Sequence, residues 1–117
     1  SGDGARRDTV VGVTTDAALV EMLKALANPA RLQLMQWLKD PATSFAEFEP
    51  IADRETVGVC VTHLQAKSGL AQSTISGYMA ALERAGLVTS TRVGKFTHYR
   101  RHDEHVESAL RHLDVSI

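Results

Sequence analysis

The sequence predicts a mainly α-helical domain with a small β-hairpin, arranged as a winged helix-turn-helix. Two short helical segments lie within residues 63–85, separated by Gly69, a residue suited to a tight left-handed turn. Two segments of strand-type residues follow within 87–101 and meet at Gly94. Helices on either side complete the expected order α-α-α-α-β-β-α, a shape that can lay one helix in a DNA major groove.

Length and composition indicate a single ordinary domain. The chain has 117 residues, of which 44% are hydrophobic and 23% are charged, values typical of a globular domain in water. No apolar run approaches the roughly 18 residues of a membrane span, and no secretory pattern opens the chain. The single cysteine, Cys60, allows no internal disulfide and suits a cytoplasmic location. We expect residues 1–15 to form a flexible segment and residues 16–117 to form the domain.

Positive charge is concentrated on the central unit. Residues 61–101 contain six Lys or Arg against one Glu, whereas residues 1–60 and 102–117 each have a net charge of −3. Cations gathered on a helix-turn-helix are typical of a surface that meets phosphate. A solvated basic face is the simpler alternative.

Two amphipathic helices are predicted before this unit. Asp16 is a suitable N-cap for a helix over residues 17–27, where apolar residues recur at i, i+3, i+4 and i+7. Asn28 and Pro29 end this helix and begin a second one that reaches about Lys39. The second helix has a wide apolar face, which predicts that it is largely buried.

The segment 40–58 differs in character from its surroundings. It contains two prolines, and it has five acidic residues against Arg54 alone. We expect an irregular excursion with one short helical turn near Phe45–Phe48. Its apolar side chains form either a lid over the core or dimer seam, or one wall of an effector pocket.

The helix-turn-helix has one apolar face and one small polar face. Residues 57–61 predict a brief strand that leads into the first helix of the pair, 63–67. In the second helix, 72–85, the inward stripe consists of Ile75, Met79 and Leu82. The outward residues are small or polar, so that the helix backbone can approach base edges: Gln72, Ser73, Thr74, Ser76, Gly77 and Ala80. Gly86 suits the position just past the helix end.

A wing and a last helix complete the prediction. Arg92 and Lys95 are expected at the hairpin tip, close to backbone phosphates or a minor groove. Asp103 is a suitable N-cap for a final helix that reaches about Asp114. This helix and the one over 17–27 have apolar faces to spare, which predicts a two-fold homodimer through the first and last helices.

Three segments in register resemble the ArsR/SmtB-type winged-helix repressors. They are Leu26–Leu32, Gly69–Ser76 and Leu82–Val88, and Gly94–Arg100 is similar to the wing of that family. The resemblance covers residues 17–114, and it implies a homodimer that represses transcription and releases its DNA when an effector binds. The 40–58 excursion is longer than the usual link, and Gly77 replaces a common basic residue. Gln65 and Ser68 stand where apolar residues are usual.

The expected DNA contacts fall into two groups. Phosphate contacts are assigned to Lys67, Arg92, Lys95, Arg100 and Arg101, together with the helix N-terminal amides at Gln72. Base-edge contacts are assigned to Gln72, Ser73, Thr74 and Ser76, with Gly77 on the same face. The expected partner is a double-stranded operator whose inverted half-sites lie about one helical turn apart.

The sequence does not identify the effector. The resembled family often senses metal with a Cys-x-Cys pair, but here the second thiol is missing. Cys60 and His63 alone supply fewer ligands than zinc takes. His105 and His112 share one face of the last helix and, with a further histidine, would gather a metal across a dimer, although exposed histidines are the simpler alternative. Cys60 is either a redox-active thiol or a small buried hydrophobe. No cofactor is expected.

Two classes of function remain. The first is a dimeric, sequence-specific DNA-binding repressor that an unidentified effector releases, through Cys60 or through the histidines of the last helix. The second is a winged-helix module for protein association that has lost DNA binding, which Gly77 and the acidic excursion favour. An enzyme is not expected, because no phosphate-binding loop, nucleophile elbow or paired carboxylates stand in a recognisable frame.

Overall fold

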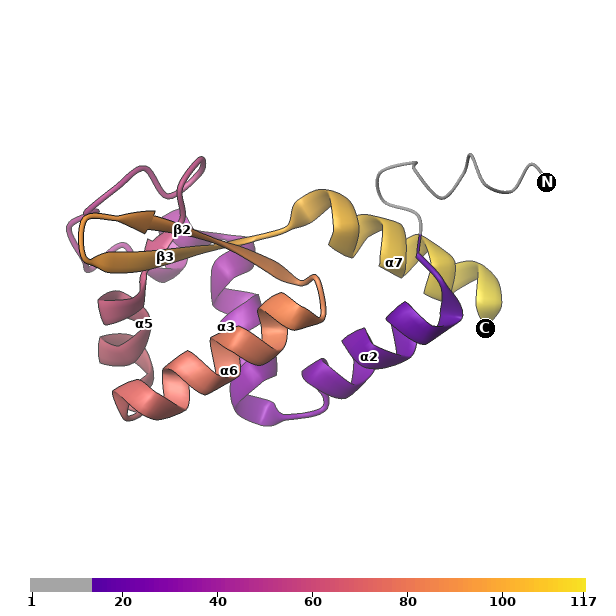
Figure 1. Ribbon diagram of the computed structural model, residues 1–117. Coiled ribbons are helices and arrows are strands. Elements are labelled where there is room, and N and C mark those ends of the chain that lie inside the picture. Colours follow the sequence, from indigo (N-terminus) through magenta and orange to yellow (C-terminus); the bar gives the residue numbers. More distant parts are fainter. Residues whose placement is uncertain (1–13) are drawn as a thin grey trace.

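The computed structural model describes residues 14–117, and the predicted winged helix-turn-helix is confirmed (Figure 1). The elements are α2 (Asp16–Leu26), α3 (Pro29–Lys39), α4 (Pro41–Ser44), β1 (Val59–Cys60), α5 (Val61–Ser68), α6 (Gln72–Arg84), β2 (Val88–Val93), β3 (Phe96–Arg101) and α7 (Asp103–Ser116). Most of the predicted flexible segment, residues 1–13, lies outside the described residues. Across residues 14–117, no helix combines the length and the apolar character that crossing a membrane requires.

The first two helices both begin at a side-chain cap. Thr15 caps α2, and its Oγ1 accepts a hydrogen bond from the Ala18 amide at 3.1 Å. The predicted cap, Asp16, is wrong by one residue, because Thr15 has the extended backbone that a cap needs and Asp16 is already helical. Asn28 caps α3, and its Oδ1 accepts from two first-turn amides at 2.9 and 3.0 Å. Pro29 follows at a position where its missing N–H costs nothing.

The excursion after α3 packs its aromatic side chains onto the domain. Phe45 is fully buried, and its ring meets Trp37 edge-on with the centroids 6.1 Å apart. The helical turn expected near Phe45–Phe48 is wrongly placed, because Pro41 starts a short helix earlier, at α4. Phe45–Phe48 forms a hydrogen-bonded turn instead, in which the Phe48 amide donates to the Phe45 carbonyl at 3.0 Å. Through Phe45, the excursion covers part of the core.

Three short antiparallel strands form one sheet in the order β1-β3-β2. The predicted hairpin of β2 and β3 is confirmed: Val93 pairs with Phe96, and Gly94 turns between them with φ 60°. The third strand, β1, is shorter than the predicted 57–61, because α5 already begins at Val61. Strand β1, which precedes the helix-turn-helix in the chain, therefore anchors the wing by pairing with β3.

Gly58 makes this anchoring possible. Its φ is 121°, a region that side-chain-bearing residues rarely adopt. A Cβ at this position would lie 2.4 Å from the carbonyl oxygen of Tyr99. The close approach lets the next residue, Val59, pair with Tyr99.

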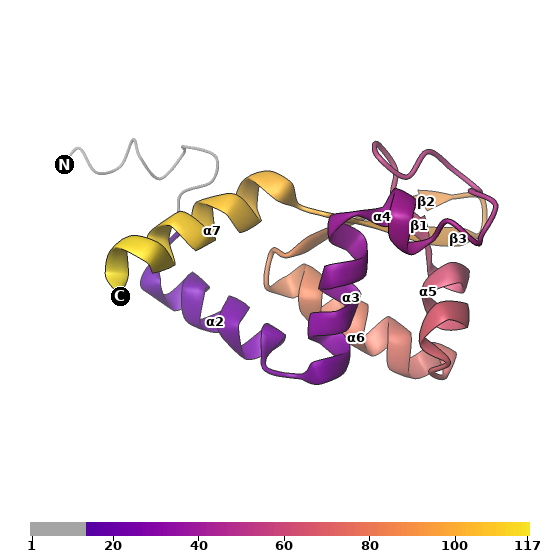
Figure 2. The same ribbon diagram turned by 180° about the vertical axis from the view of Figure 1, so that it is seen from behind.

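The helices α2 and α7 lie side by side at one end of the domain, while the hairpin tip and α5 lie at the other (Figures 1 and 2). His102 occupies the N-cap of α7, so the predicted cap, Asp103, is wrong and is the first helical residue instead. Val106 and Ala109 are buried, whereas Leu110 is 52% exposed. The end of the domain formed by α2 and α7 therefore has apolar surface left over.

Candidate nucleic-acid interface

Helix α6 presents the polar face that its sequence predicts. Ile75, Met79 and Leu82 each have 0% exposure and bind the helix to the core. On the opposite side, Gln72, Ser73 and Gly77 are exposed, and Thr74 and Ser76 are half-buried. Three buried apolar residues at i, i+4 and i+7 leave no other orientation, so the small polar side must face solvent.

The first turn of α6 has backbone amides that can donate hydrogen bonds to a ligand. Ala71 is its N-cap and makes no side-chain hydrogen bond, so the cap leaves the amides of that turn unsatisfied. Such amides, together with the helix dipole, favour an anion at this end. The same turn carries Gln72 and Ser73.

The turn before α6 is held by hydrogen bonds that involve the unusual Ser68. Gly69 has φ 72°, and its amide donates to the Gln65 carbonyl at 2.9 Å. The Ser68 hydroxyl donates to the same carbonyl at 3.2 Å and accepts from the Leu70 amide at 3.2 Å. Leu64, at 0% exposure, holds α5 to the core. A polar residue at position 68 therefore braces the turn that sets the angle between α5 and α6.

The wing tip carries two exposed cations. Arg92 and Lys95 lie on either side of Gly94, and the Arg92 Nε donates to the Gly94 carbonyl at 3.3 Å. The Lys95 ammonium lies 5.7 Å from the centroid of the Phe96 ring. Both side chains are anchored locally and leave their charge in solvent.

One groove joins the wing to α6. Its volume is about 400 Å³, and it is lined by Gln72 and Ser76 from α6 and by Arg92 and Lys95 from the wing, among other residues. Tyr99 forms part of its wall, and burial, with a contribution from Glu83, raises the pKa of this phenol. The groove thus brings side chains assigned to base edges next to side chains assigned to phosphate.

Three of the side chains that were predicted to contact phosphate lie outside this groove. The Lys67 ammonium pairs with Glu47 at 3.3 Å and lies 5.1 Å from the centroid of the Trp37 ring. Arg101 is 13% exposed, and its Nη1 is 2.8 Å from Asp103. Arg100 is exposed but lines a different cavity, beneath the excursion. The structure therefore does not bring these three cations into the groove between α6 and the wing.

Cys60 is inaccessible in this structure. Its exposure is 1%, and its Sγ lies 3.0 Å from the Thr62 hydroxyl. Across the sheet it pairs with His98, which is fully buried and whose two ring nitrogens have no partner among the described residues. Burial lowers the pKa of nearby His63, and the positive charges of Arg54 and of His98 when protonated add to this effect.

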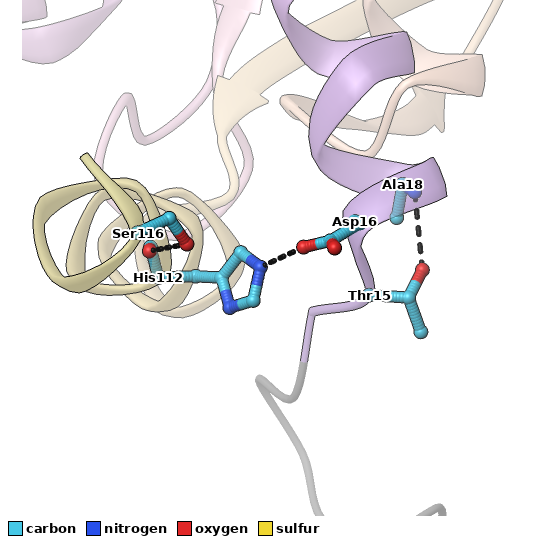
Figure 3. A network of polar contacts seen from close by, with 5 residues as sticks. All are labelled: Thr15, Asp16, Ala18, His112 and Ser116. Carbon is cyan, nitrogen blue, oxygen red and sulfur yellow. Dashed lines mark hydrogen bonds and ion pairs between the residues drawn. The ribbon is translucent and has the colours of Figure 1, made fainter.

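The histidines of the last helix point to different neighbours. Figure 3 shows His112 directed at Asp16, the first residue of α2, with 2.7 Å between Nε2 and Oδ1. His105 stacks on His102 with the ring centroids 5.5 Å apart. Burial, with a contribution from His102, lowers the pKa of His105. Within residues 14–117, no three His, Cys, Asp or Glu side chains gather as a metal site.

Arg31 has a structural role that the sequence patterns do not indicate. Its Nε donates to the Ala25 carbonyl at 2.7 Å, and its guanidinium lies 5.4 Å from the centroid of the Tyr78 ring. It therefore connects the end of α2 to α6.

Comparison with known proteins places this architecture in a family. No protein-family model matches the chain. The chain is 47% identical over 98 residues to YbzH of Bacillus subtilis, an HTH-type transcriptional regulator, covering 84% of this chain and 97% of that protein. It is 32% identical over 95 residues to ArsR2 of Halobacterium salinarum, named as an arsenical resistance operon repressor, covering 81% of this chain and 67% of that protein.

A solved structure extends the comparison to three dimensions. It is the homodimeric winged helix-turn-helix DNA-binding domain of a possible ArsR-family regulator from Mycobacterium bovis. It has 25% sequence identity and a TM-score of 0.56, and the match covers 88% of both chains. The chain belongs to the ArsR family of helix-turn-helix transcriptional regulators.

Proposed function

We propose that the protein is a homodimeric repressor that binds an inverted-repeat operator and releases it when an effector binds. The observation that carries this proposal is the groove shared by α6 and the wing, where Gln72 and Ser76 face Arg92 and Lys95. Hydrogen-bonding side chains on a helix can read base edges in the major groove, while the wing cations neutralise the backbone beside it.

The proposed dimer uses the apolar surface left on α2 and α7. Val20 and Leu23 on α2 are 47% and 42% exposed, and Leu110 and Val115 on α7 are 52% and 82% exposed. A two-fold axis along this surface pairs each patch with its own copy, which is the usual closed arrangement. It also sets the two α6 helices at a fixed spacing, as an inverted repeat requires.

Salt dependence is the first test of this proposal. If each protomer neutralises three or four phosphates, log affinity should fall against log salt with a slope of roughly −5 to −7. The measurement is fluorescence anisotropy with a labelled duplex from the promoter of the protein's own operon. A complex indifferent to salt would contradict the mechanism. Absence of binding at low salt would favour the protein-association alternative.

Charge-matched variants locate the contacts. Replacing both Arg92 and Lys95 by glutamine should reduce the slope by roughly 4 for the dimer, at about 0.9 per lost phosphate contact. The control is Lys24→Gln, which removes the same type of charge from the exposed face of α2 and should leave the slope unchanged. Gln72→Ala should instead relax base preference, by about 1–3 kcal/mol at one position. Equal slopes in the wing variant and the control would show that the wing does not contact the DNA phosphates.

The thiol route to release requires a structural change. A reagent reaches the Cys60 Sγ, at 1% exposure, only when β1 and the start of α5 open. Release through Cys60 therefore predicts that an oxidant weakens operator binding slowly in the wild type and not at all in Cys60→Ser. Release that persists in the variant would exclude the thiol as the sensor.

A further inference from the structure

A second concave site lies on the opposite side of the wing from α6. The excursion lies above the hairpin and α6 lies below it in both views (Figures 1 and 2). Between the excursion, the end of α3 and the base of the wing is a cavity of about 90 Å³. Its charged lining consists of Lys39, Arg54, Arg100, Arg101, Glu55 and Asp103. The four cations exceed the two carboxylates, so the cavity is positive beneath a segment that is otherwise acidic.

Arg54 is the residue best placed to hold an anion there. It is the one cation of the excursion, and its Nη2 donates to the Phe48 carbonyl at 2.7 Å, which fixes the guanidinium. Its Nε is buried and has no partner among the described residues. Water does not reach this nitrogen, so an anion in the cavity would meet Arg54 through the outer nitrogens of its guanidinium. Arg100 brings a second guanidinium with no ion pair inside the described part of the chain.

The size and the donors of the cavity select the ligand. A volume of about 90 Å³ is several times the ~10–15 Å³ that a cavity needs in order to hold one water molecule. That space is too small to enclose a nucleotide or an aromatic metabolite, and it can hold one small oxyanion. The planar, forked donors of arginine match the oxygen geometry of phosphate and related anions. We propose that this cavity binds a small free oxyanion of the phosphate class, held mainly by Arg54 and Arg100.

The position of the cavity links it to both ends of the molecule. Arg100 and Arg101 are the last residues of β3, directly before α7. The Arg101 Nη1 lies 2.8 Å from Asp103 and 3.9 Å from Glu107, both on α7. An anion in the cavity competes with these carboxylates for Arg101 and so biases the joint between the wing and α7. Given the proposed function, the anion and the operator then alter each other's affinity by the same factor.

The binding test needs no DNA. Inorganic phosphate is titrated into the full-length protein by calorimetry, with sodium chloride at the same ionic strength as the reference. The wild type should bind phosphate saturably, and Arg54→Gln and Arg100→Gln should each raise the Kd at least tenfold. Lys24→Gln, a charge-matched control on α2, should bind like the wild type. Circular dichroism confirms that each variant is folded. Lack of saturable binding, or equal binding by all four proteins, would overturn the site.

A second arm separates the free anion from a DNA phosphate. Operator affinity is measured by anisotropy with and without phosphate at constant ionic strength. A change in affinity that disappears in Arg54→Gln supports the coupling, whereas an unchanged affinity overturns the coupling and leaves the anion site standing. If Arg54→Gln weakens operator binding without phosphate present, the cavity takes a backbone phosphate of DNA, and the free-anion proposal is wrong.

Discussion

Replacing Gly58 by alanine should destabilise the protein by about 3 kcal/mol or more. A side chain at φ 121° stores strain of about 1–3 kcal/mol by itself. The new Cβ would also lie 2.4 Å from the Tyr99 carbonyl oxygen and 3.0 Å from the Arg100 nitrogen. Both are backbone atoms and cannot rotate away. Relief requires β1 to leave β3, which breaks the Val59–Tyr99 pairing and exposes Val59, now at 1%.

Urea unfolding followed by circular dichroism measures this loss. Gly77→Ala is the matched control, because it makes the same chemical change in the interior of α6, where a Cβ meets nothing within 4 Å. Alanine is the better helix former, so the control should gain about 0.5–1 kcal/mol. The two variants should therefore move in opposite directions. A Gly58→Ala protein within about 0.5 kcal/mol of the wild type would show that β1 does not dock on β3 as described.

Three further predictions concern the histidines. The folded-state pKa values of His63 and His105 lie below the ordinary 6.5. As the pH drops through 6.5, the unfolded chain therefore takes up protons before the native protein does, and the urea midpoint should fall. The fall should be less steep in a variant with glutamine at both positions than in the wild type. His98→Leu removes two buried, unpartnered nitrogens and should leave stability unchanged or raise it, by up to about 1–3 kcal/mol; a marked loss by urea unfolding would reveal an unseen partner. His112→Ala breaks the contact with Asp16, which is 90% exposed, and should lower the thermal midpoint by the equivalent of less than about 1 kcal/mol; a larger drop would mean that the pair organises the joint between α2 and α7.

Features that depend on neighbours in the chain could be predicted from the sequence. The inward stripe of α6 follows from three apolar residues at helical spacing, and all three are fully buried. The turns at Gly69 and Gly94 follow from the one residue type that accepts positive φ at no cost. The caps of α2 and α7 were each misplaced by one residue, because Thr15 competes with Asp16 and His102 precedes Asp103.

Features that depend on distant partners could not be predicted in this way. The charge and position of Lys67 predict a phosphate contact, but they do not indicate the partners of its side chain in this structure, Glu47 of the excursion and Trp37 of α3. The pairing of β1 with β3 likewise joins segments about forty residues apart. The sequence around Gly58 does not predict this pairing. The groove between α6 and the wing combines both kinds of feature. The sequence predicts its residues one by one, but only the tertiary structure shows that they line the same groove.

The contact between α2 and α7 bears on how the protein is made. Asp16 and His112 are separated by 96 positions in the chain. At about 5–20 residues per second, roughly 5–20 s pass between the synthesis of these two residues. Until then α2, whose Leu19 and Met22 are buried in the finished domain, lacks its contact with α7. The end of the domain formed by α2 and α7 is therefore the last part of the fold to be completed during synthesis.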